Sequence, residues 1–442
     1  MSPATSLVAT ALLGSLLYNS KTDKEAPTYT LDTDKTQSPP SNPHEEFPWP
    51  EVSLKTINWV SLTILTVTPL LALIGLAFVP LRATTFWFAV AYYFFTGMGI
   101  TAGYHRYWSH RSYDATRVWQ FFILAAGTGA MEGSVKWWSY GHRIHHRFTD
   151  TEKDPYNAKR GFLWSHIGWM IINEEKKAKV DVSDLTKDPW IRFQHKHYIQ
   201  LAVFMAFVVP TLIAGIGWGD WLGGFFFAGV ARLVFVHHST FCINSLAHYY
   251  GENTYDDRRT PKDNVITALI TLGEGYHNFH HEFPADYRNA IEVHEYDPTK
   301  WLIWIASLFG LTYNLKMFPA NEILKGKVTM QEKKIAEIRK TLTYGVPLES
   351  LPSLTHEQVK ERIAETGKQL MIISGIVYDV SDFMEDHPGG KGFLKVSVGR
   401  DVTASFNGGV YNHANAARNL MTTMRYAILV GETPESETAA LE

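Results

Sequence analysis

The sequence has a single cysteine, Cys242, among its 442 residues. One thiol can form no disulfide within the chain, and it cannot supply the thiolates of a structural zinc site. Charge of one sign is also scarce, because the formal net charge is only -3. The chain therefore has no overall field that would favour nucleic acid as a partner. The short apolar run from Leu7 to Leu17 has no basic residue before it, so it is a poor secretory signal and is too short to cross a bilayer.

Hydrophobic residues, which make up 45% of the chain, gather in four long runs. Each run is about 20 residues long, which at about 1.5 Å per residue spans roughly 30 Å of hydrocarbon. The alternative, buried helices of a large soluble protein, is disfavoured by the length of the runs and their near absence of charge. The predicted membrane spans are residues 57–80, 84–104, 198–217 and 221–241.

The basic residues indicate how these spans are oriented. Segment 105–197 carries 15 Lys and Arg, whereas the two tight turns between paired spans carry one, Arg82. Because cytoplasmic loops are enriched in Lys and Arg, segment 105–197 is predicted to be cytosolic. With four spans, both termini and everything after residue 241 then lie on the same side.

Eight histidines form three short clusters, all predicted to emerge on this cytosolic side. The second cluster (142–146) and the third (277–281) have histidines at i, i+3 and i+4, which places three imidazoles on one helical face. Imidazole suits iron, zinc, copper or nickel. His248, with Asn244 one turn earlier, is a possible ninth ligand. Nine ligands exceed the about four to six that one ion accepts, which indicates two metal ions. The clustered histidines are His105, His110, His142, His145, His146, His277, His280 and His281.

A small polar domain is predicted at residues 348–432, after a charged linker helix at 321–347. Two strand-like runs precede the motif Phe-Met-Glu-Asp-His-Pro-Gly-Gly at 383–390, and His413 follows 26 residues after His387. This pattern resembles the cytochrome b5 haem-binding domain, and the resemblance implies haem b with His387 and His413 as axial ligands. A haem held by two histidines has no open position, so it passes electrons but binds neither oxygen nor substrate. The alternative is that the two glycines merely form a turn.

An electron carrier fused to a histidine-rich membrane protein indicates oxygen chemistry on an apolar substrate. The segments Thr101–Arg111, Asn244–His248 and Gly273–His281 resemble the membrane fatty acid desaturase superfamily. With a C-terminal cytochrome b5 domain, the chain is similar to fungal-type acyl-CoA (stearoyl-CoA) delta-9 desaturases. That resemblance implies oxygen-dependent desaturation of palmitoyl- or stearoyl-CoA at two non-haem iron ions. It also implies electrons from NADH-cytochrome b5 reductase and a multi-pass location in the endoplasmic reticulum membrane, in contact with membrane lipid.

The resemblance also assigns site residues. The nine histidines above would bind metal, and Asn244 would contribute through a water. Lys159 and Arg160 match the family's contacts with the coenzyme, although a solvated basic pair at a membrane surface is the alternative. Substrate positions along the acyl chain would be Trp138 and Thr240 at its bend, with Tyr93 and Gly97 at the floor of its tunnel, so Gly97→Phe is predicted to favour shorter chains. Ordinary aromatic packing is the alternative for Trp138.

The predicted fold is mainly α: four transmembrane helices with a cytosolic helical cap, plus a small α+β domain. Its units are a disordered tail at 1–47, a membrane domain at 48–320, the linker helix, the haem domain, and a tail at 433–442. A membrane fatty acyl hydroxylase and a non-enzymatic membrane electron carrier remain alternative functions. His237 and His238, inside the fourth span, belong to no cluster and are expected to hydrogen-bond within the bundle.

Overall fold

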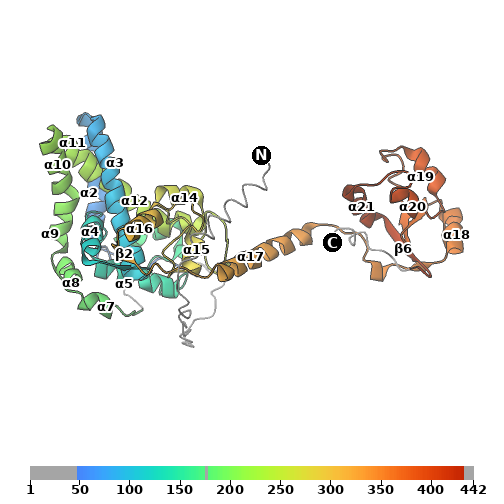
Figure 1. The fold of residues 1–442 in the computed structure, drawn as a ribbon, viewed down its shortest axis with the longest axis horizontal. Coiled ribbons are helices and arrows are strands. Elements are labelled where there is room, and N and C mark those ends of the chain that lie inside the picture. The colour runs from blue at the N-terminus through green and yellow to red at the C-terminus, as the bar shows by residue number, and fades with distance from the viewer. Residues whose placement is uncertain (1–46, 175–177, 433–442) are drawn as a thin grey trace.

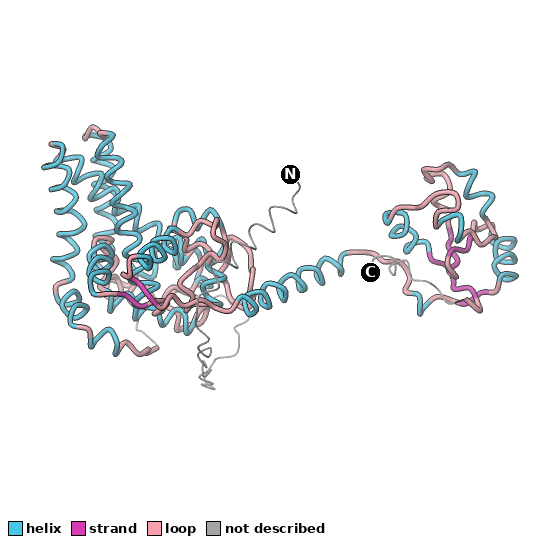
Figure 2. Tube along the Cα trace, in the orientation of Figure 1, coloured by secondary structure: helices cyan, strands magenta, loops and turns pink. Residues whose placement is uncertain are grey.

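The computed structural model describes residues 47–174 and 178–432. The two predicted disordered tails therefore lie almost entirely outside the described residues. Figure 1 shows a large helical part that contains the metal-ligand candidates and a small domain joined to it by helix α17 (Ala320–Thr341). Strands occur mainly in the small domain, as Figure 2 shows, so the prediction of a mainly helical protein with a small α+β domain is confirmed.

Three of the described helices are long and apolar enough to cross a membrane: Trp59–Phe78, Tyr198–Trp218 and Trp221–Tyr249. Their apolar side chains point outward, as for Leu73 and Phe78 of the first helix, which are 61% and 81% exposed. The predicted second span, 84–104, forms helix α3 (Ala83–Met98) and the start of the π-helix η1 (Gly99–Ser109). It is not among the three, because α3 has only 16 residues and the polar residues of the first histidine cluster follow it closely.

The long helices are built from shorter segments. The first is α2 (Trp59–Phe78), which begins at Asn58, whose side chain accepts a hydrogen bond from the Ser61 amide. The turn between the helices Tyr198–Trp218 and Trp221–Tyr249 has a positive φ at Gly219 (70°), a conformation that glycine adopts at little cost. The others are α9 (Tyr198–Val203), η4 (Phe204–Val208) and α10 (Val209–Trp218), followed by α11 (Trp221–Gly223), η5 (Gly224–Ala231), α12 (Arg232–Asn244) and α13 (Leu246–Tyr249).

A buried polar contact joins the two helical hairpins at the end away from the histidines. The Thr85 hydroxyl donates to the Asp220 carboxylate, and the Trp218 indole N–H donates to Thr85 Oγ1 at 2.9 Å. Arg82 donates to the Trp218 carbonyl at 3.1 Å. These contacts fix how the ends of α2 and α3 lie beside the turn between α10 and α11 (Figure 1).

Shorter helices pack around the opposite end of the bundle and form its core. Helix α4 lies along η1, and Tyr104, Tyr113 and Ile123 are fully buried between them and their neighbours. Strands β1 (Asp114–Ala115) and β2 (Thr312–Tyr313) pair antiparallel and tie this region to a later segment. The helices are α4 (Arg117–Thr128), α5 (Val135–Phe148), η2 (Ala158–Arg160), η3 (Trp164–Gly168), α6 (Trp169–Ile171), α7 (Ser183–Lys187), α8 (Pro189–Lys196), α14 (Val265–Ile270), α15 (His277–Glu282) and α16 (Pro298–Leu308).

Helix α17 connects the two parts of the molecule. Its first turn is anchored where Ile323 packs into a cluster with Phe279 and Phe283, and Lys333 forms an ion pair with Asp257 at 2.7 Å. The helix ends at Thr341, so the last residues of the predicted linker helix are extended chain leading to Pro347.

The small domain has a four-stranded sheet in the order β3-β6-β5-β4, with β3 parallel to β6 and the other pairs antiparallel. Alternate side chains of a strand face opposite sides, and here each face covers its own hydrophobic cluster. The two strand-like runs predicted from the sequence, residues 369–373 and 375–380, correspond to β4 and β5. The elements are η6 (Leu348–Ser350), β3 (Ser353–Leu354), α18 (His356–Thr366), β4 (Leu370–Ile373), β5 (Ile376–Asp379), α19 (Lys391–Ser397), α20 (Thr403–Phe406), α21 (Asn415–Met421), η7 (Thr422–Met424) and β6 (Arg425–Leu429).

Candidate metal centre and haem site

The nine predicted ligand histidines meet in two adjoining sets. The five-histidine set contains two half-buried residues, His110 and His146, whereas every member of the four-histidine set is buried. Within each set, one nitrogen of every ring lies within 4.8 Å of the others. The five-histidine set is His105, His110, His142, His146 and His280, and the four-histidine set is His145, His248, His277 and His281.

Local helix geometry explains how the ligands of each cluster point together. Helix α5 presents the second cluster and α15 presents the third, each with the i, i+3, i+4 spacing that the sequence predicted. The first cluster lies on a π-helix instead of an α-helix. The His110 amide donates to the His105 carbonyl at 3.1 Å, the i to i+5 bond of a π-helix, which brings residues five apart to the same side.

The ε nitrogens of these rings face one another at short distances. In the five-histidine set, His105 and His280 have Nε2 atoms 2.9 Å apart, and His110 and His142 have theirs 2.8 Å apart. In the four-histidine set the Nε2 atoms of His277 and His248 are 3.1 Å apart. Such separations are those of neighbouring ligand atoms around one ion with metal–nitrogen bonds of about 2 Å.

The opposite ring nitrogens show which way the protons point. His105 Nδ1 lies 2.8 Å from Glu274 Oε2, and His145 Nδ1 lies 2.8 Å from Asp154 Oδ1. Since an ionised carboxylate can only accept, each Nδ1 carries the proton and each Nε2 presents a lone pair. Several lone pairs facing one another in a buried space require a cation between them. The donor set therefore fits metal binding.

Burial favours the neutral form of six of the clustered imidazoles, which is the form that binds metal. Desolvation holds the pKa of His142 and of His277 well below the usual range, and the neighbouring imidazoles lower it further. The pKa values of the other cluster histidines with resolved shifts move the same way for the same first cause: His110, His146, His280 and His281.

A buried charge network supports His105 and was not predicted. Arg106 donates to Glu274 at 2.8 Å and to Asp297 at 3.0 Å, and all three side chains are almost fully buried. Burial alone would raise the pKa of Glu274, but Arg106 and His105 lower it to about 2. Glu274 is thus a fixed negative charge beside the five-histidine set. The signal in the sequence was an acidic residue three positions before His277.

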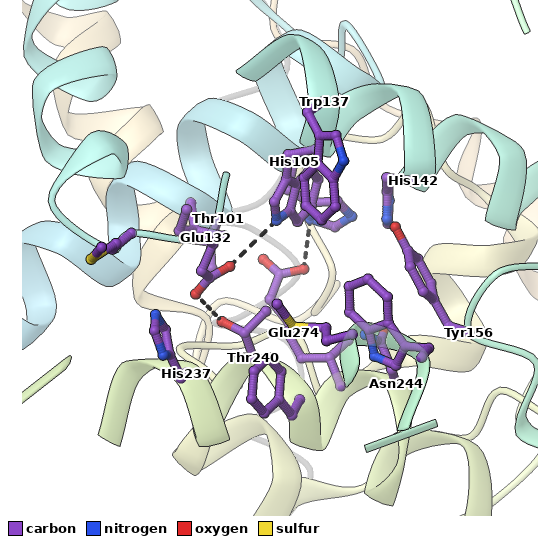
Figure 3. A pocket seen from close by; sticks show the side chains of 17 residues that line it. Thr101, His105, Glu132, Trp137, His142, Tyr156, His237, Thr240, Asn244 and Glu274 are labelled. Carbon is purple, nitrogen blue, oxygen red and sulfur yellow. Dashed lines mark hydrogen bonds and ion pairs between the residues drawn. The ribbon is translucent and has the colours of Figure 1, made fainter. Parts of the chain in front are cut away.

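A cavity adjoins the five-histidine set, and Figure 3 shows the side chains around it. Among them are Trp138, Thr240 and Asn244, as predicted for substrate or water contacts. The Trp138 ring stacks on His142 with centroids 4.9 Å apart. Glu132, which sequence reasoning missed, accepts from Thr240 Oγ1 at 2.7 Å and from Trp138 Nε1 at 3.3 Å. Burial raises the pKa of Glu132 to about 8, so this carboxyl is mostly neutral at pH 7.

The two predicted floor residues do not line this cavity. The Tyr93 hydroxyl donates to the Ile270 carbonyl at 2.7 Å. Gly97 lies against Leu272, whose Cδ1 is 2.6 Å from where a Cβ on residue 97 would be. These two residues therefore contact the segment 270–272, which precedes the third histidine cluster in the sequence.

The predicted basic pair and the two extra histidines have partners of their own. The Arg160 guanidinium is buried and forms an ion pair with Glu174, with nitrogen–oxygen distances of 2.7 and 3.1 Å. The Lys159 amide donates to the Asn157 side chain. His237 Nε2 lies 3.0 Å from the Ala130 carbonyl and His238 Nδ1 lies 3.1 Å from His166 Nε2. The expectation that His237 and His238 hydrogen-bond within the bundle is confirmed.

In the small domain, His387 and His413 face each other with ring centroids 6.4 Å apart. His387 Nδ1 lies 3.1 Å from the Gly390 carbonyl and His413 Nδ1 lies 3.0 Å from the Phe406 carbonyl. Carbonyls accept, so each ring keeps its Nε2 lone pair. The separation accommodates an ion with an axial bond of about 2 Å on each side, so the pair fits a haem iron.

Comparison with known proteins agrees with this arrangement. Residues 80–313 match the model of the family described as fatty acid desaturase, and residues 355–430 match the cytochrome b5-like haem/steroid binding domain. The chain belongs to the fatty acid desaturase family and carries a C-terminal cytochrome b5-like domain. It is a membrane protein with several apolar helices.

Individual relatives match most of the chain. A probable acyl-CoA desaturase of Schizosaccharomyces pombe is 50% identical over 390 residues, which are 88% of this chain and 81% of the relative. Acyl-CoA desaturase 1 of Saccharomyces cerevisiae is 48% identical over 379 residues, 84% of this chain and 74% of the relative. Human stearoyl-CoA desaturase 5 is 37% identical over 269 residues, 59% of this chain and 82% of the relative.

Proposed function

We propose that this protein is an acyl-CoA delta-9 desaturase. It removes one hydrogen from each of two adjacent methylenes of palmitoyl- or stearoyl-CoA and leaves a cis double bond between carbons 9 and 10. One O2, two electrons and two protons are consumed, and two molecules of water form. The observation that carries the proposal is the convergence of nine imidazoles in two sets beside a cavity, in a chain that also contains a haem-type histidine pair.

The two histidine sets are proposed to hold one iron ion each, with Asn244 contributing through a water. Iron in such a site, when bound, supplies the oxygen-derived oxidant that an unactivated methylene requires. The role of the chain is to hold the ions with neutral ligands and to place negative charge behind them. Glu274 and Asp154 do the latter through His105 and His145.

The cavity beside the five-histidine set is proposed to hold the acyl chain near its reacting carbons. Its lining is largely apolar, with Ile100, Trp138 and Phe241 among its residues, so a hydrocarbon chain can displace water from it. Thr240 and Trp138 both donate to Glu132, which satisfies the polar groups of this wall and leaves apolar surface for the substrate. A bent chain fixed here presents one pair of methylenes to the metal side.

The ends of the substrate are assigned by family resemblance. Lys159 and Arg160 are proposed to lie near the phosphates of the coenzyme, which carry charge to the cytosolic side. Because the Arg160 guanidinium already pairs with Glu174, a direct contact with phosphate would require it to exchange partners. Tyr93 and Gly97 are proposed to bound the far end of the acyl tunnel together with Leu272.

Electrons are proposed to enter through haem b held by His387 and His413, reduced by NADH-cytochrome b5 reductase. The proposed location is the endoplasmic reticulum membrane, with α3 and η1 completing four spans and with both termini and the metal site in the cytosol. The surplus of Lys and Arg in segment 105–197 supports this orientation. Unit boundaries near 320 and 348 are supported by the positions of α17 and η6.

One assay tests the proposal against its alternatives. Purified full-length protein is supplied with NADH, the reductase, O2 and stearoyl-CoA, and products are identified by mass spectrometry. A delta-9 unsaturated product is expected. A hydroxylated product would replace the proposal with a hydroxylase, and no turnover with metal and haem both present would indicate an electron carrier.

A further inference from the structure

The turn that follows the second histidine cluster, residues 149–154, contacts the four-histidine set from behind. Two of its side chains contact ligands directly: Asp154 lies next to His145 Nδ1, and Thr149 lies next to His281 Nδ1. A third, Asp150, reaches His248 Nδ1 through Thr260. These contacts are made at Nδ1, the ring nitrogen opposite the converging ε nitrogens. Their contacts are therefore those of residues that orient ligands.

The first contact is made by Asp154. One of its carboxylate oxygens lies 2.8 Å from His145 Nδ1, and the same oxygen accepts from the Tyr156 amide at 3.0 Å. The other oxygen accepts from the Asp150 amide at 3.0 Å. Asp154 is 1% exposed, so these bonds are shielded from water. It fixes the turn and the ring of His145 at the same time.

The second contact is a relay from Asp150 to His248 through Thr260. The Thr260 hydroxyl donates to Asp150 Oδ1 at 2.6 Å, and the Thr260 amide donates to Asp150 Oδ2 at 2.7 Å. His248 Nδ1 lies 2.7 Å from the same Thr260 oxygen. Asp150 is 1% exposed and has a φ of 64°, a left-handed conformation that aspartate tolerates better than most residues.

The chemistry of these groups sets the direction of every proton in the relay. A carboxylate only accepts, so the single hydroxyl proton of Thr260 is committed to Asp150. The Thr260 oxygen can then only accept from His248, which places the His248 proton on Nδ1. His248 Nε2 is thereby left with its lone pair facing His277 Nε2, 3.1 Å away.

This relay matters because His248 stands apart from the histidine clusters. It lies on α13, a helix of four residues that contains no other histidine of the two sets. The other set has a different support, Glu274, which comes just before α15 and bonds to His105. A change in the turn or in Thr260 therefore addresses one metal position and leaves the other alone.

We propose that Asp150 and Thr260 are positioning residues that fix the ring and tautomer of His248 and so hold the ion of the four-histidine set. The inference rests on the proposed function, in which this set binds a metal. Loss of such an outer partner typically weakens metal binding about 10- to 100-fold. The expected result is a protein that keeps its haem and the metal of the five-histidine set but loses the other metal.

The test compares three variants of the full-length protein in detergent. Thr260→Val removes the hydroxyl at nearly constant shape, and Thr260→Ser restores it. Thr312→Val is the control: Thr312, in β2, is buried where Thr260 is half-buried, and its hydroxyl likewise makes one hydrogen bond as donor, to the Ile303 carbonyl at 2.8 Å. Each protein is reconstituted with ferrous iron without oxygen. Iron and haem are then measured in the same sample, and release of iron to a chelator is followed in time.

We expect about two non-haem irons per haem in the starting protein, Thr260→Ser and Thr312→Val, and about one in Thr260→Val, with the second iron released about 10- to 100-fold faster. Two firmly held irons in Thr260→Val would overturn the proposal. So would equal loss in Thr260→Ser, which would indicate packing instead of the hydroxyl.

If Thr260→Val fails to yield folded protein, Asp150→Asn decides. Asparagine tolerates the same left-handed backbone but cannot accept from both Thr260 groups through both of its side-chain atoms. Faster release of one iron supports the proposal, and a release rate like that of the starting protein overturns it. A starting protein that never holds two irons would instead overturn the proposed function.

Discussion

The two histidine sites of this molecule differ in what lies behind their ligands. At the metal centre, three Nδ1 atoms face buried carboxylates: those of His105 and His145 do so directly, and that of His248 does so through the Thr260 hydroxyl. At the haem site, His387 and His413 face backbone carbonyls instead. The same ligand type is thus supported by full charges in one place and by dipoles in the other.

Charge balance explains this difference. Nine neutral imidazoles leave the positive charge of two ions uncompensated, and a buried uncompensated charge is costly. Glu274 and Asp154 supply negative charge one hydrogen bond beyond the ligands, and Asp150 supplies it two hydrogen bonds beyond. A haem brings its own negative charge in the porphyrin, so neutral carbonyls suffice to orient its two ligands. The arrangement of acidic residues therefore distinguishes a bare-ion site from a haem site.

The largest expected effect comes from deleting one ligand at each site. We expect His277→Ala to abolish turnover with the haem absorption spectrum unchanged, because His277 belongs only to the four-histidine set. His387→Ala should do the reverse and remove haem while the non-haem iron content stays near that of the starting protein. Product formation, the spectrum and the iron content are measured together. Surviving activity in His277→Ala would exclude this histidine as a ligand.

Removing the charge behind a ligand should have the next largest effect. Glu274→Gln keeps the shape and one acceptor oxygen but leaves Arg106 with Asp297 as its only carboxylate among these contacts. We expect iron release from the five-histidine set to become about 10- to 100-fold faster. Glu337→Gln is the control, since Glu337 lies exposed on α17 and pairs with Lys340. An unchanged release rate in Glu274→Gln would contradict the charge-balance argument.

The long apolar helices and the convergence of six of the nine histidines, those of the second and third clusters, could be predicted because they depend on local periodicity. The supporting residues could not be, because their partners are distant in sequence. Glu132 and Thr240 are 108 residues apart, and Asp150 and Thr260 are 110 apart. His105 and His110 lie side by side because their segment forms a π-helix, and α-helical spacing did not predict this backbone conformation. The phosphate contact of Arg160 was predicted from the family resemblance, and its ion pair with Glu174, 14 residues later, could not be predicted from local pattern.

The buried carboxyls of Glu132 and Glu274 differ in pKa, and the dependence of stability on pH should show the shift of Glu132. Burial raises the pKa of Glu132 to about 8, whereas Arg106 and His105 hold the pKa of Glu274 at about 2 despite its burial. Between about pH 4.5 and pH 8 the folded protein binds a proton at Glu132 that the unfolded chain releases, so this group makes stability fall as pH rises through that window. We expect Glu132→Gln to lessen the fall in melting temperature between pH 6 and pH 8.5. An equally steep fall in the variant would show that Glu132 titrates as an ordinary glutamate.

The smallest effect should come from the end of the acyl tunnel, where no charge is involved. A Cβ on residue 97 would lie 2.6 Å from Leu272 Cδ1, so any side chain there must displace the tip of Leu272. If Leu272 bounds the far end of the tunnel, Gly97→Phe shortens it, and the ratio of 16- to 18-carbon products should rise with iron and haem contents unchanged. Gly217→Phe is the control, because a Cβ on the exposed Gly217 would meet nothing within 4 Å, so this change should leave the ratio unaltered. An unchanged ratio in Gly97→Phe would place the end of the tunnel elsewhere, and it would leave the charge arrangement around the two metals unaffected.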